Sequence, residues 1–183
     1  MRIIARLDIK NDILVKAIMF DGVKKLGNPE IFAEKYYKEG IDELMIVNNT
    51  GSLYNTRLNP ILLEKIRVNK PIPISAGGGI SNYDDAMKLI ESGCDKVVIN
   101  SLIHKDIKEV KKIVNTIGAA SVTGAIQYEK KNDNNLVYQK SKENDIFWKS
   151  CFNADYICVN HEDNISFRVV GRKIFIKKDL PLN

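Results

Sequence analysis

Short runs of apolar residues alternate along the chain with stretches in which apolar residues recur every three or four positions. Runs of the first kind are typical of buried strands, and the second pattern is typical of amphipathic helices. Strands are expected at Ile3 to Leu7, Glu43 to Val47, Ile72 to Ser75, Lys96 to Ile99, Ser121 to Ile126 and Tyr156 to Val159. Helices are expected at Pro29 to Glu39, Asn59 to Val68, Asn82 to Ser92, Lys105 to Thr116 and Asp145 to Cys151. This alternation predicts an α/β fold built on a parallel sheet.

Details of the pattern support this interpretation. The run Val97-Val98-Ile99 is apolar on both faces, as expected for a strand covered by helices on one side and by other side chains on the other. Asn28 before Pro29 is typical of a helix start, because the asparagine caps the first turn and proline fits the first helical position. Gly40 and Gly93 stand where the preceding helices must stop.

The alternation changes in the last part of the chain. A polar segment from Tyr128 to Tyr138 follows the fifth strand and predicts a hairpin, and residues 165–178 alternate like two short strands around Gly171-Arg172. A sheet of six strands would leave two edges with unpaired backbone groups. We therefore expect this tail either to cover an edge of its own sheet or to exchange with a second copy, and of the two outcomes the homodimer is preferred.

Length and composition limit the number of domains and the kinds of partner that are expected. With 183 residues and 44% hydrophobic content the chain can bury one core, so one domain over residues 1–183 is expected. The 28 basic and 23 acidic residues give a net charge of +5, spread without a basic stripe. Nucleic acid is therefore not an expected partner, whereas an anionic small molecule is compatible with this charge.

The cysteines, histidines and apolar runs indicate which metal sites and which cellular location to expect. Cys94, Cys151 and Cys158 form no CxxC pair, and the histidines are His104 and His161, so neither a structural zinc nor another metal site is expected. The sequence has no run of 18 apolar residues and begins without the apolar stretch of a signal peptide. A cytoplasmic protein without a membrane partner or a cofactor is the resulting expectation.

A glycine-rich turn is the sharpest chemical signal. Gly77-Gly78-Gly79 follows a predicted strand and precedes a predicted helix, and the next strand ends in Asn100-Ser101. Glycines at this place let backbone N–H groups approach a phosphate without an intervening side chain. Gly78, Gly79, Asn100 and Ser101 are therefore candidate phosphate ligands, although a purely structural turn would have the same glycines.

A carboxylate ends the first predicted strand. Asp8 is followed by a polar loop and then Lys16, and Asn48 ends the second predicted strand. A carboxylate at the carboxyl end of a barrel strand is suited to general acid or base catalysis, and a nearby lysine can attract an anionic substrate. A solvated or helix-capping aspartate is the alternative interpretation of Asp8.

Five blocks of sequence together resemble the cyclase subunit of imidazole glycerol phosphate synthase, a histidine-biosynthesis βα-barrel family. The blocks, in the order and spacing of that family, are residues 2–10, Leu14-Val15-Lys16, residues 40–44, Gly77-Gly78-Gly79-Ile80 and residues 95–101. The resemblance covers about residues 2–160, so residues 1–160 are family-like and residues 161–183 form a divergent tail. It implies a TIM-type (βα) barrel that is incomplete, with about six βα units and a short β-like tail, since a complete barrel usually needs about 200 to 250 residues.

The resemblance also implies a reaction. A partner glutaminase releases ammonia, which crosses the barrel and attacks a bis-phosphorylated ribulosyl aminoimidazole carboxamide intermediate to give imidazole glycerol phosphate. By resemblance, Asp8 is a catalytic aspartate, Lys16 is the lysine of the first loop, and Gly79, Asn100 and Ser101 hold one phosphate. Arg2, Glu43 and Lys96 match charged residues of the family's ammonia gate.

Several positions depart from the family pattern. The second catalytic aspartate falls on Gln127, and an amide cannot exchange protons near neutral pH. The carboxylate expected after the second strand falls on Asn48, the fourth gate residue falls on Tyr156, and the last two barrel strands have no counterpart. These departures favour one alternative, a degraded barrel that only binds phosphate or a partner. A second alternative is a related barrel that delivers ammonia to a sugar in surface-polysaccharide biosynthesis, which residues 6–10 and Ser52-Leu53-Tyr54 resemble more closely.

Overall fold

A computed structural model describes residues 2–18, 22–131, 134–137, 156–160, 167–170 and 174–176, and the side chains of residues 3–16 and 24–125. Its central strands are β1 (Arg2–Lys10), β4 (Glu43–Asn48), β5 (Ile74–Gly77), β6 (Lys96–Ile99), β7 (Val122–Lys131) and β9 (Tyr156–Asn160). Each of these strands pairs in parallel with the next, in chain order. The expected parallel sheet and its six strands are confirmed.

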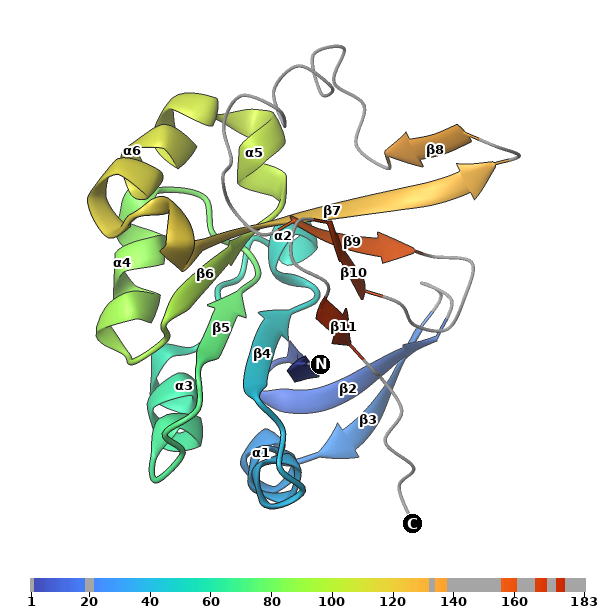
Figure 1. Cartoon of the computed structure of the whole chain (residues 1–183), viewed down its shortest axis with the longest axis vertical. Helices are drawn as coiled ribbons and strands as arrows, with labels where there is room; N and C mark the ends of the chain where they lie inside the picture. The colour runs from blue at the N-terminus through green and yellow to red at the C-terminus, as the bar shows by residue number, and fades with distance from the viewer. Residues whose placement is uncertain are drawn as a thin grey trace.

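The tail closes this sheet into a ring. Strand β10 (Phe167–Val170) pairs antiparallel with β9, and β11 (Ile174–Ile176) pairs antiparallel with β10. Strand β11 then pairs in parallel with β1, where Arg2 lies opposite Ile174. Figure 1 shows these two strands in dark red between β9 and the N-terminal strand. The prediction that the tail covers an edge of its own sheet is therefore confirmed, and the turn at Gly171-Arg172 lies outside the described residues.

Helices cover the outside of the sheet. They are α1 (Pro29–Lys38), α3 (Pro60–Arg67), α4 (Tyr83–Glu91) and α6 (Ile107–Ile117), each between two parallel strands, and Figure 1 shows α3, α4 and α6 along one side of the strands. The predicted helix starts are confirmed, since Asn28 caps α1 by accepting a hydrogen bond from the N–H of Glu30 at 2.7 Å. Asn59 and Asp106 cap α3 and α6 in the same way.

The core lies between the helices and the outer face of the sheet. Alternate residues of each strand point outward into it, as the two-residue period of a strand requires. In β1 these are Ala5, Leu7 and Ile9, which pack with helix residues such as Ala33 and Leu63. The intervening residues of β1, Arg6 and Asp8, therefore point into the ring of strands.

Two strands and two short helices differ from the sequence-based expectation. The segment after Asp8, expected as a polar loop, is a hairpin of β2 (Ile13–Ile18) and β3 (Gly22–Gly27). Two short helices, α2 (Gly51–Tyr54) and α5 (Ser101–Lys105), were not expected. The polar hairpin after the fifth strand is confirmed, because β7 pairs antiparallel with β8 (Asn134–Val137). The helix expected at Asp145 to Cys151 lies outside the described residues.

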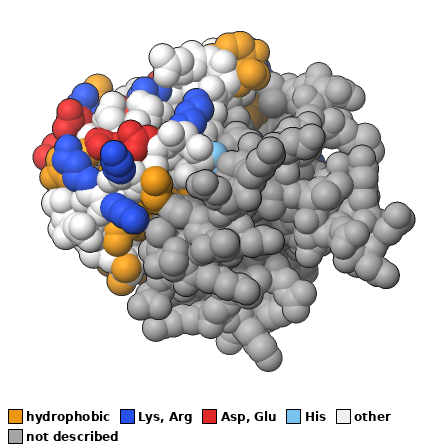
Figure 2. Space-filling view, turned by 90° about the horizontal axis from the view of Figure 1, so that it is seen from above, with side chains coloured by type: hydrophobic (Ala, Val, Ile, Leu, Met, Phe, Trp, Pro, Cys, Tyr) orange, Lys and Arg blue, Asp and Glu red, His pale blue; other side chains and the backbone are white. Residues whose placement is uncertain are grey.

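The described surface mixes charges of both signs. Figure 2 shows Lys and Arg side chains beside Asp and Glu side chains on this part of the molecule, without a single-sign stripe across it. Within the described residues, no helix is both long enough and apolar enough to cross a bilayer.

Candidate functional site

The carboxyl ends of the parallel strands bring the candidate residues to one end of the ring. Asp8 lies next to Val47 in the β1–β4 ladder, and Gly77 ends β5 beside Val98 of β6. Asn100 follows β6 directly and precedes α5. The sequence-based expectation that Asp8, the glycine turn and Asn100-Ser101 share this end is confirmed by the strand order.

Asp8 is paired with an arginine of its own strand. Nε of Arg6 donates to Oδ1 of Asp8 at 2.5 Å, and Nη2 of Arg6 donates to Oδ1 of Asn49 at 2.9 Å. Both side chains of the ion pair are almost buried, at 12% and 8% exposure. Residues two apart on a strand share a face, so the spacing of Arg6 and Asp8 allows this pairing, which was not among the sequence-based expectations. Within the pair one positive charge faces one negative charge, and Asp8 acts as a hydrogen-bond acceptor.

The glycine turn, residues 77–81, is in contact with the end of β4 and the loop that follows it. Gly78 has a φ of +99°, and a Cβ there would lie 2.3 Å from the carbonyl oxygen of Asn48. Gly79 has a φ of +82°, and its Cβ would lie 1.9 Å from the carbonyl oxygen of Thr56. Only glycine fits both the backbone conformation and the close approach. The three-glycine motif is therefore required by the local packing, whatever it binds.

Asn48 organises the loop that follows β4. Its Oδ1 accepts hydrogen bonds from the N–H of Thr50 at 3.1 Å and from Oγ1 of Thr50 at 3.2 Å, and its Nδ2 donates to Oγ1 of Thr56 at 3.2 Å. An amide can both accept and donate in this way, whereas an ionised carboxylate could only accept. The asparagine found where the family pattern has a carboxylate is therefore a structural residue of this loop.

A third loop contributes to the candidate phosphate site. Ser101 is nearly buried at the first position of α5, and its Oγ donates to Oγ of Ser52 in α2 at 2.8 Å. Ser52 itself is exposed. The structure thus places a second hydroxyl beside the predicted ligand Ser101. No local pattern indicates this pairing, because the two serines are 49 positions apart.

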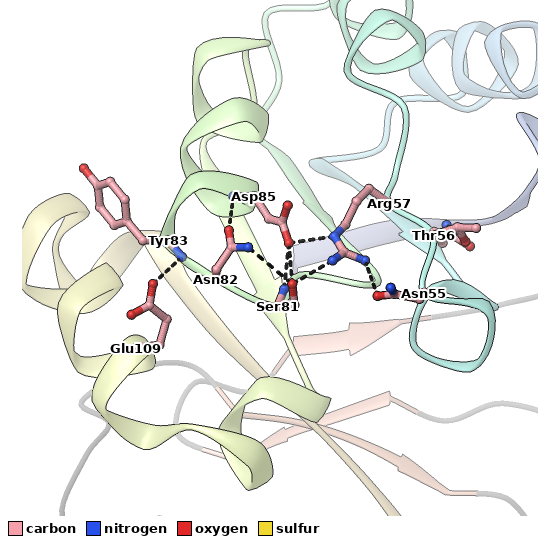
Figure 3. A network of polar contacts seen from close by, with 9 residues as sticks. Asn55, Thr56, Arg57, Ser81, Asn82, Tyr83, Asp85 and Glu109 are labelled. Carbon is pink, nitrogen blue, oxygen red and sulfur yellow. Dashed lines mark hydrogen bonds and ion pairs between the residues drawn. The ribbon is translucent and has the colours of Figure 1, made fainter.

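A polar cluster fixes the far end of the glycine turn (Figure 3). Oδ2 of Asp85 accepts from Nε of Arg57 at 2.6 Å and from the N–H and Oγ of Ser81, both at 2.9 Å. Partial burial works to raise the pKa of Asp85, but the hydrogen bonds from Ser81 and Arg57 outweigh it and hold the pKa below its ordinary value. The cluster is therefore built around an ionised carboxylate.

The opposite end of the ring holds the residues expected to form a gate. Nζ of Lys96 lies 3.6 Å from Oε2 of Glu43, and Glu43 is 2% exposed. Oγ of Ser75 donates to Oε1 of Glu43 at 2.5 Å, a contact that the sequence analysis missed. Glu43 and Lys96 are each the first residue of their strand, so the structure brings these two together as predicted. The side chain of Arg2 lies outside the described residues.

Two further candidates occupy different places. Lys16 is an exposed residue of β2, opposite Lys24 in the hairpin. Gln127 lies on β7 opposite Val159 of β9, and its side chain is outside the described residues. Within the described part of the chain, no group of three or more His, Cys, Asp or Glu side chains could hold a metal ion.

The sequence of the chain matches a known family over most of its length. Residues 2–153 match the family described as histidine biosynthesis protein. The chain belongs to the histidine biosynthesis protein family. The fold is accordingly an incomplete TIM-type barrel of that family, and the match begins and ends close to the limits that the resemblance gave.

Three similar curated proteins have the same name. The chain is 37% identical over 126 residues to the imidazole glycerol phosphate synthase subunit HisF of Legionella pneumophila, covering 69% of this chain and 59% of the relative. The subunits of Pyrococcus furiosus and Petrotoga mobilis are 35% and 33% identical, over 68% and 75% of this chain and 50% and 54% of their own lengths. The chain therefore spans little more than half the length of the relatives it matches.

Proposed function

We propose that the chain acts as the cyclase-type subunit of an imidazole glycerol phosphate synthase. In this reaction, ammonia from a glutaminase partner attacks a bis-phosphorylated ribulosyl aminoimidazole carboxamide intermediate. The products are imidazole glycerol phosphate and an aminoimidazole carboxamide ribonucleotide. The proposal places the chain among carbon-nitrogen lyases of histidine biosynthesis.

One observation carries the proposal. In a member of the histidine biosynthesis protein family, Asp8, the glycine turn and Ser101 come to the same end of a parallel ring of strands. Ligand sites of such barrels lie at this end, because the loops that follow the strands converge there. An acid-base group and an anion site within one mouth suit a phosphorylated substrate.

Each residue then has a role. The backbone N–H groups of Gly78 and Gly79, with the side chains of Asn100 and Ser101, bind one phosphate of the substrate. Asp8 accepts a proton during ring closure, and its pairing with Arg6 through Oδ1 keeps the carboxylate in place. Lys16, on the exposed hairpin, attracts the anionic substrate to the mouth.

The charged residues at the other end support the ammonia route. The ion pair between the buried Glu43 and the partly exposed Lys96 lies at the amino ends of β4 and β6, on the side of the ring away from Asp8. With Arg2, these residues would form the gate through which ammonia from the glutaminase enters. The partner protein would dock on this face.

A binding function without catalysis is the second candidate. It is favoured by Gln127, which stands where the family has its second catalytic aspartate and cannot exchange protons near neutral pH. In that case the barrel would hold a phosphorylated ligand or a glutaminase and turn nothing over. Delivery of ammonia to a surface sugar is a third reading, and it shares the phosphate site and the gate with the first.

Two measurements separate these functions. The purified protein is assayed with ammonium salt and the ribulosyl intermediate, and its affinity for glycerol phosphate is measured by calorimetry. The cyclase proposal predicts slow product formation that disappears in Asp8→Asn, while glycerol phosphate still binds. Binding without turnover in either protein would favour the second candidate, and product formation that persists in Asp8→Asn would exclude Asp8 as the proton acceptor.

A further inference from the structure

The glycine turn rests against the loop that follows β4, residues 49–57, here called the β4 loop. A Cβ on Gly51 would lie 2.6 Å from the backbone nitrogen of Gly79, and a Cβ on Gly79 would meet the carbonyl oxygen of Thr56. The two backbones therefore touch with no side chain between them. The shape of the glycine turn depends on where the β4 loop lies.

Arg57 ends the β4 loop and reaches across to the glycine turn. Its Nη2 donates to Oγ of Ser81 at 2.7 Å, and its Nε donates to Oδ2 of Asp85 at 2.6 Å. Its Nη1 donates to Oδ1 of Asn55 at 3.1 Å, within the loop itself. Figure 3 shows the guanidinium group between Asn55 on one side and Ser81 with Asp85 on the other. One planar group thus joins the loop, the turn and helix α4.

Asp85 completes the connection from the side of the helix. The same Oδ2 that accepts from Arg57 also accepts from the backbone N–H of Ser81, the last residue of the glycine turn. The exposed fraction of the Asp85 side chain is 13% and that of Arg57 is 34%. A partly buried, charge-assisted hydrogen bond of this kind constrains its partners more than an exposed ion pair does. The end of the turn is therefore held at both its backbone and its side chain.

The β4 loop also touches the other half of the candidate phosphate site. Oγ of Ser52 accepts the hydrogen bond from Oγ of Ser101, which begins the helix after β6. A displacement of the β4 loop would thus move the glycine turn and the hydroxyl beside Ser101 together. The two halves of the site come from separate loops, and the β4 loop contacts both.

We propose that Arg57 is a positioning residue, which fixes the β4 loop against the glycine turn and so holds the phosphate site in its binding arrangement. This inference rests on the phosphate site of the proposed function and adds a residue that no sequence motif indicated. Arg57 acts through Ser81 and Asp85 and through the loop. A site held in place before binding spares the ligand the cost of ordering it.

The test compares variants of two arginines that have similar exposure and that each pair with an aspartate. In Arg57→Met the connection is lost, whereas Arg67→Met removes an arginine that is 33% exposed and lies 3.2 Å from Asp95, at the opposite end of the strands. The unfolding temperature of each variant is measured first. The affinity for glycerol phosphate is then measured well below the lower of the two unfolding temperatures. We expect Arg57→Met to bind glycerol phosphate about tenfold more weakly, because the ligand must then also order the loop and the turn. Arg67→Met should bind like the wild type.

Hydrogen exchange of residues 77–81 provides the second readout. We expect faster exchange in Arg57→Met and wild-type exchange in Arg67→Met. Arg57→Lys should resemble Arg57→Met, because an ammonium group cannot reach three partners with the geometry of a guanidinium fork. Wild-type affinity and wild-type exchange in both Arg57 variants would overturn the inference.

The two readouts also separate this inference from the proposed function. Should the wild type not bind glycerol phosphate, the phosphate site of the proposed function is wrong, and the exchange of residues 77–81 alone decides whether Arg57 holds the turn. Weaker binding in Arg67→Met equal to that in Arg57→Met would show a general loss of stability and would also overturn the inference.

Discussion

Gly79 illustrates how one residue can be required by both conformation and contact. At φ +82° an alanine is strained by roughly 1–2 kcal/mol, and its Cβ would also meet the carbonyl oxygen of Thr56. Gly40 has nearly the same φ, +81°, with no atom within 4 Å of its added Cβ. Gly79→Ala should therefore lower the free energy of unfolding more than Gly40→Ala does, as measured by urea denaturation.

The same pair of variants also tests the phosphate site. Gly79→Ala displaces the β4 loop or the turn itself, so glycerol phosphate affinity should fall, whereas Gly40→Ala, after helix α1, should leave the affinity unchanged. Equal losses of stability in the two variants, together with unchanged affinity in both, would show that the contact with Thr56 has no consequence.

Gln127 is the residue that we expect to limit the proposed chemistry. The reaction needs two titratable groups, and an amide cannot replace the second one. Loss of one acid-base partner typically lowers the rate by about 10²- to 10⁴-fold. Gln127→Asp should therefore raise the cyclisation rate with ammonia, by up to about this factor. Gln127→Asn, which restores the length of aspartate without its charge, is the control. If Gln127→Asp turns over no faster than the wild type, Gln127 does not limit the rate.

At the scale of elements, helix α4 owes part of its stability to an ionised carboxylate. Because the pKa of Asp85 is lower in the folded protein than its ordinary value, the folded state binds fewer protons at this group than the unfolded state. Its contribution to stability is complete above about pH 4, the ordinary range of aspartate, and is lost as the pH falls through the lower, folded value.

A comparison of variants measures this contribution. The difference in free energy of unfolding between the wild type and Asp85→Asn should be largest at pH 6 and should shrink in urea titrations at successively lower pH. Asp84→Asn gives the baseline, since Asp84 is the exposed neighbour of Asp85 and makes no hydrogen bond within the described residues. A difference that stays constant down to pH 3 would contradict the role of the Asp85 carboxylate.

The elements that the sequence analysis missed are short and depend on their surroundings. Helices α2 and α5 have four and five residues, too few for a repeated apolar pattern and too few to be stable alone. They form where Gly51 meets the glycine turn and where Ser101 meets Ser52. Strands β2 and β3 contain several lysines and a pairing irregularity after Leu14, so their polar segments resembled a loop.

At the scale of the whole molecule, the tail decides whether the barrel has open edges. Strand β10 is paired with β9 over four residues, and β11 is paired with β1 over two. Removal of residues 161–183 would leave β1 and β9 with unpaired N–H and C=O groups, which favour association between copies. We expect larger particles in light scattering and faster hydrogen exchange in β1 and β9.

Removal of residues 177–183 alone is the matched control, because it keeps both β10 and β11. The longer truncation should associate and the shorter should behave as the full chain. A longer truncation that remains monodisperse, with unchanged exchange in β1 and β9, would show that the tail does not protect these edges. Light scattering of the full chain also tests the homodimer, which stays a prediction.

The sequence by itself determined the order of the six parallel strands and of the four long helices between them, the N-cap of α1 and the residues at the strand ends. These features depend on neighbours within a few positions, such as Asn28 beside Pro29 or Gly77 before a helix, so the local pattern contains them. The five-block resemblance added the family. Asp8, Gly79 and Ser101 could be proposed for one site because the ends of parallel strands must meet.

Only the tertiary structure decided which side chains contact one another across the chain. The pairing of Ser52 with Ser101, of Arg57 with Asp85, and of β11 with β1 joins residues separated by 28 positions or more. The spacing of apolar residues along the sequence does not indicate such contacts, because each contact depends on how the sheet places two separate loops or strands. The sequence indicated the candidate ligands of the proposed site, and the tertiary structure shows which residues contact the loops that contain them.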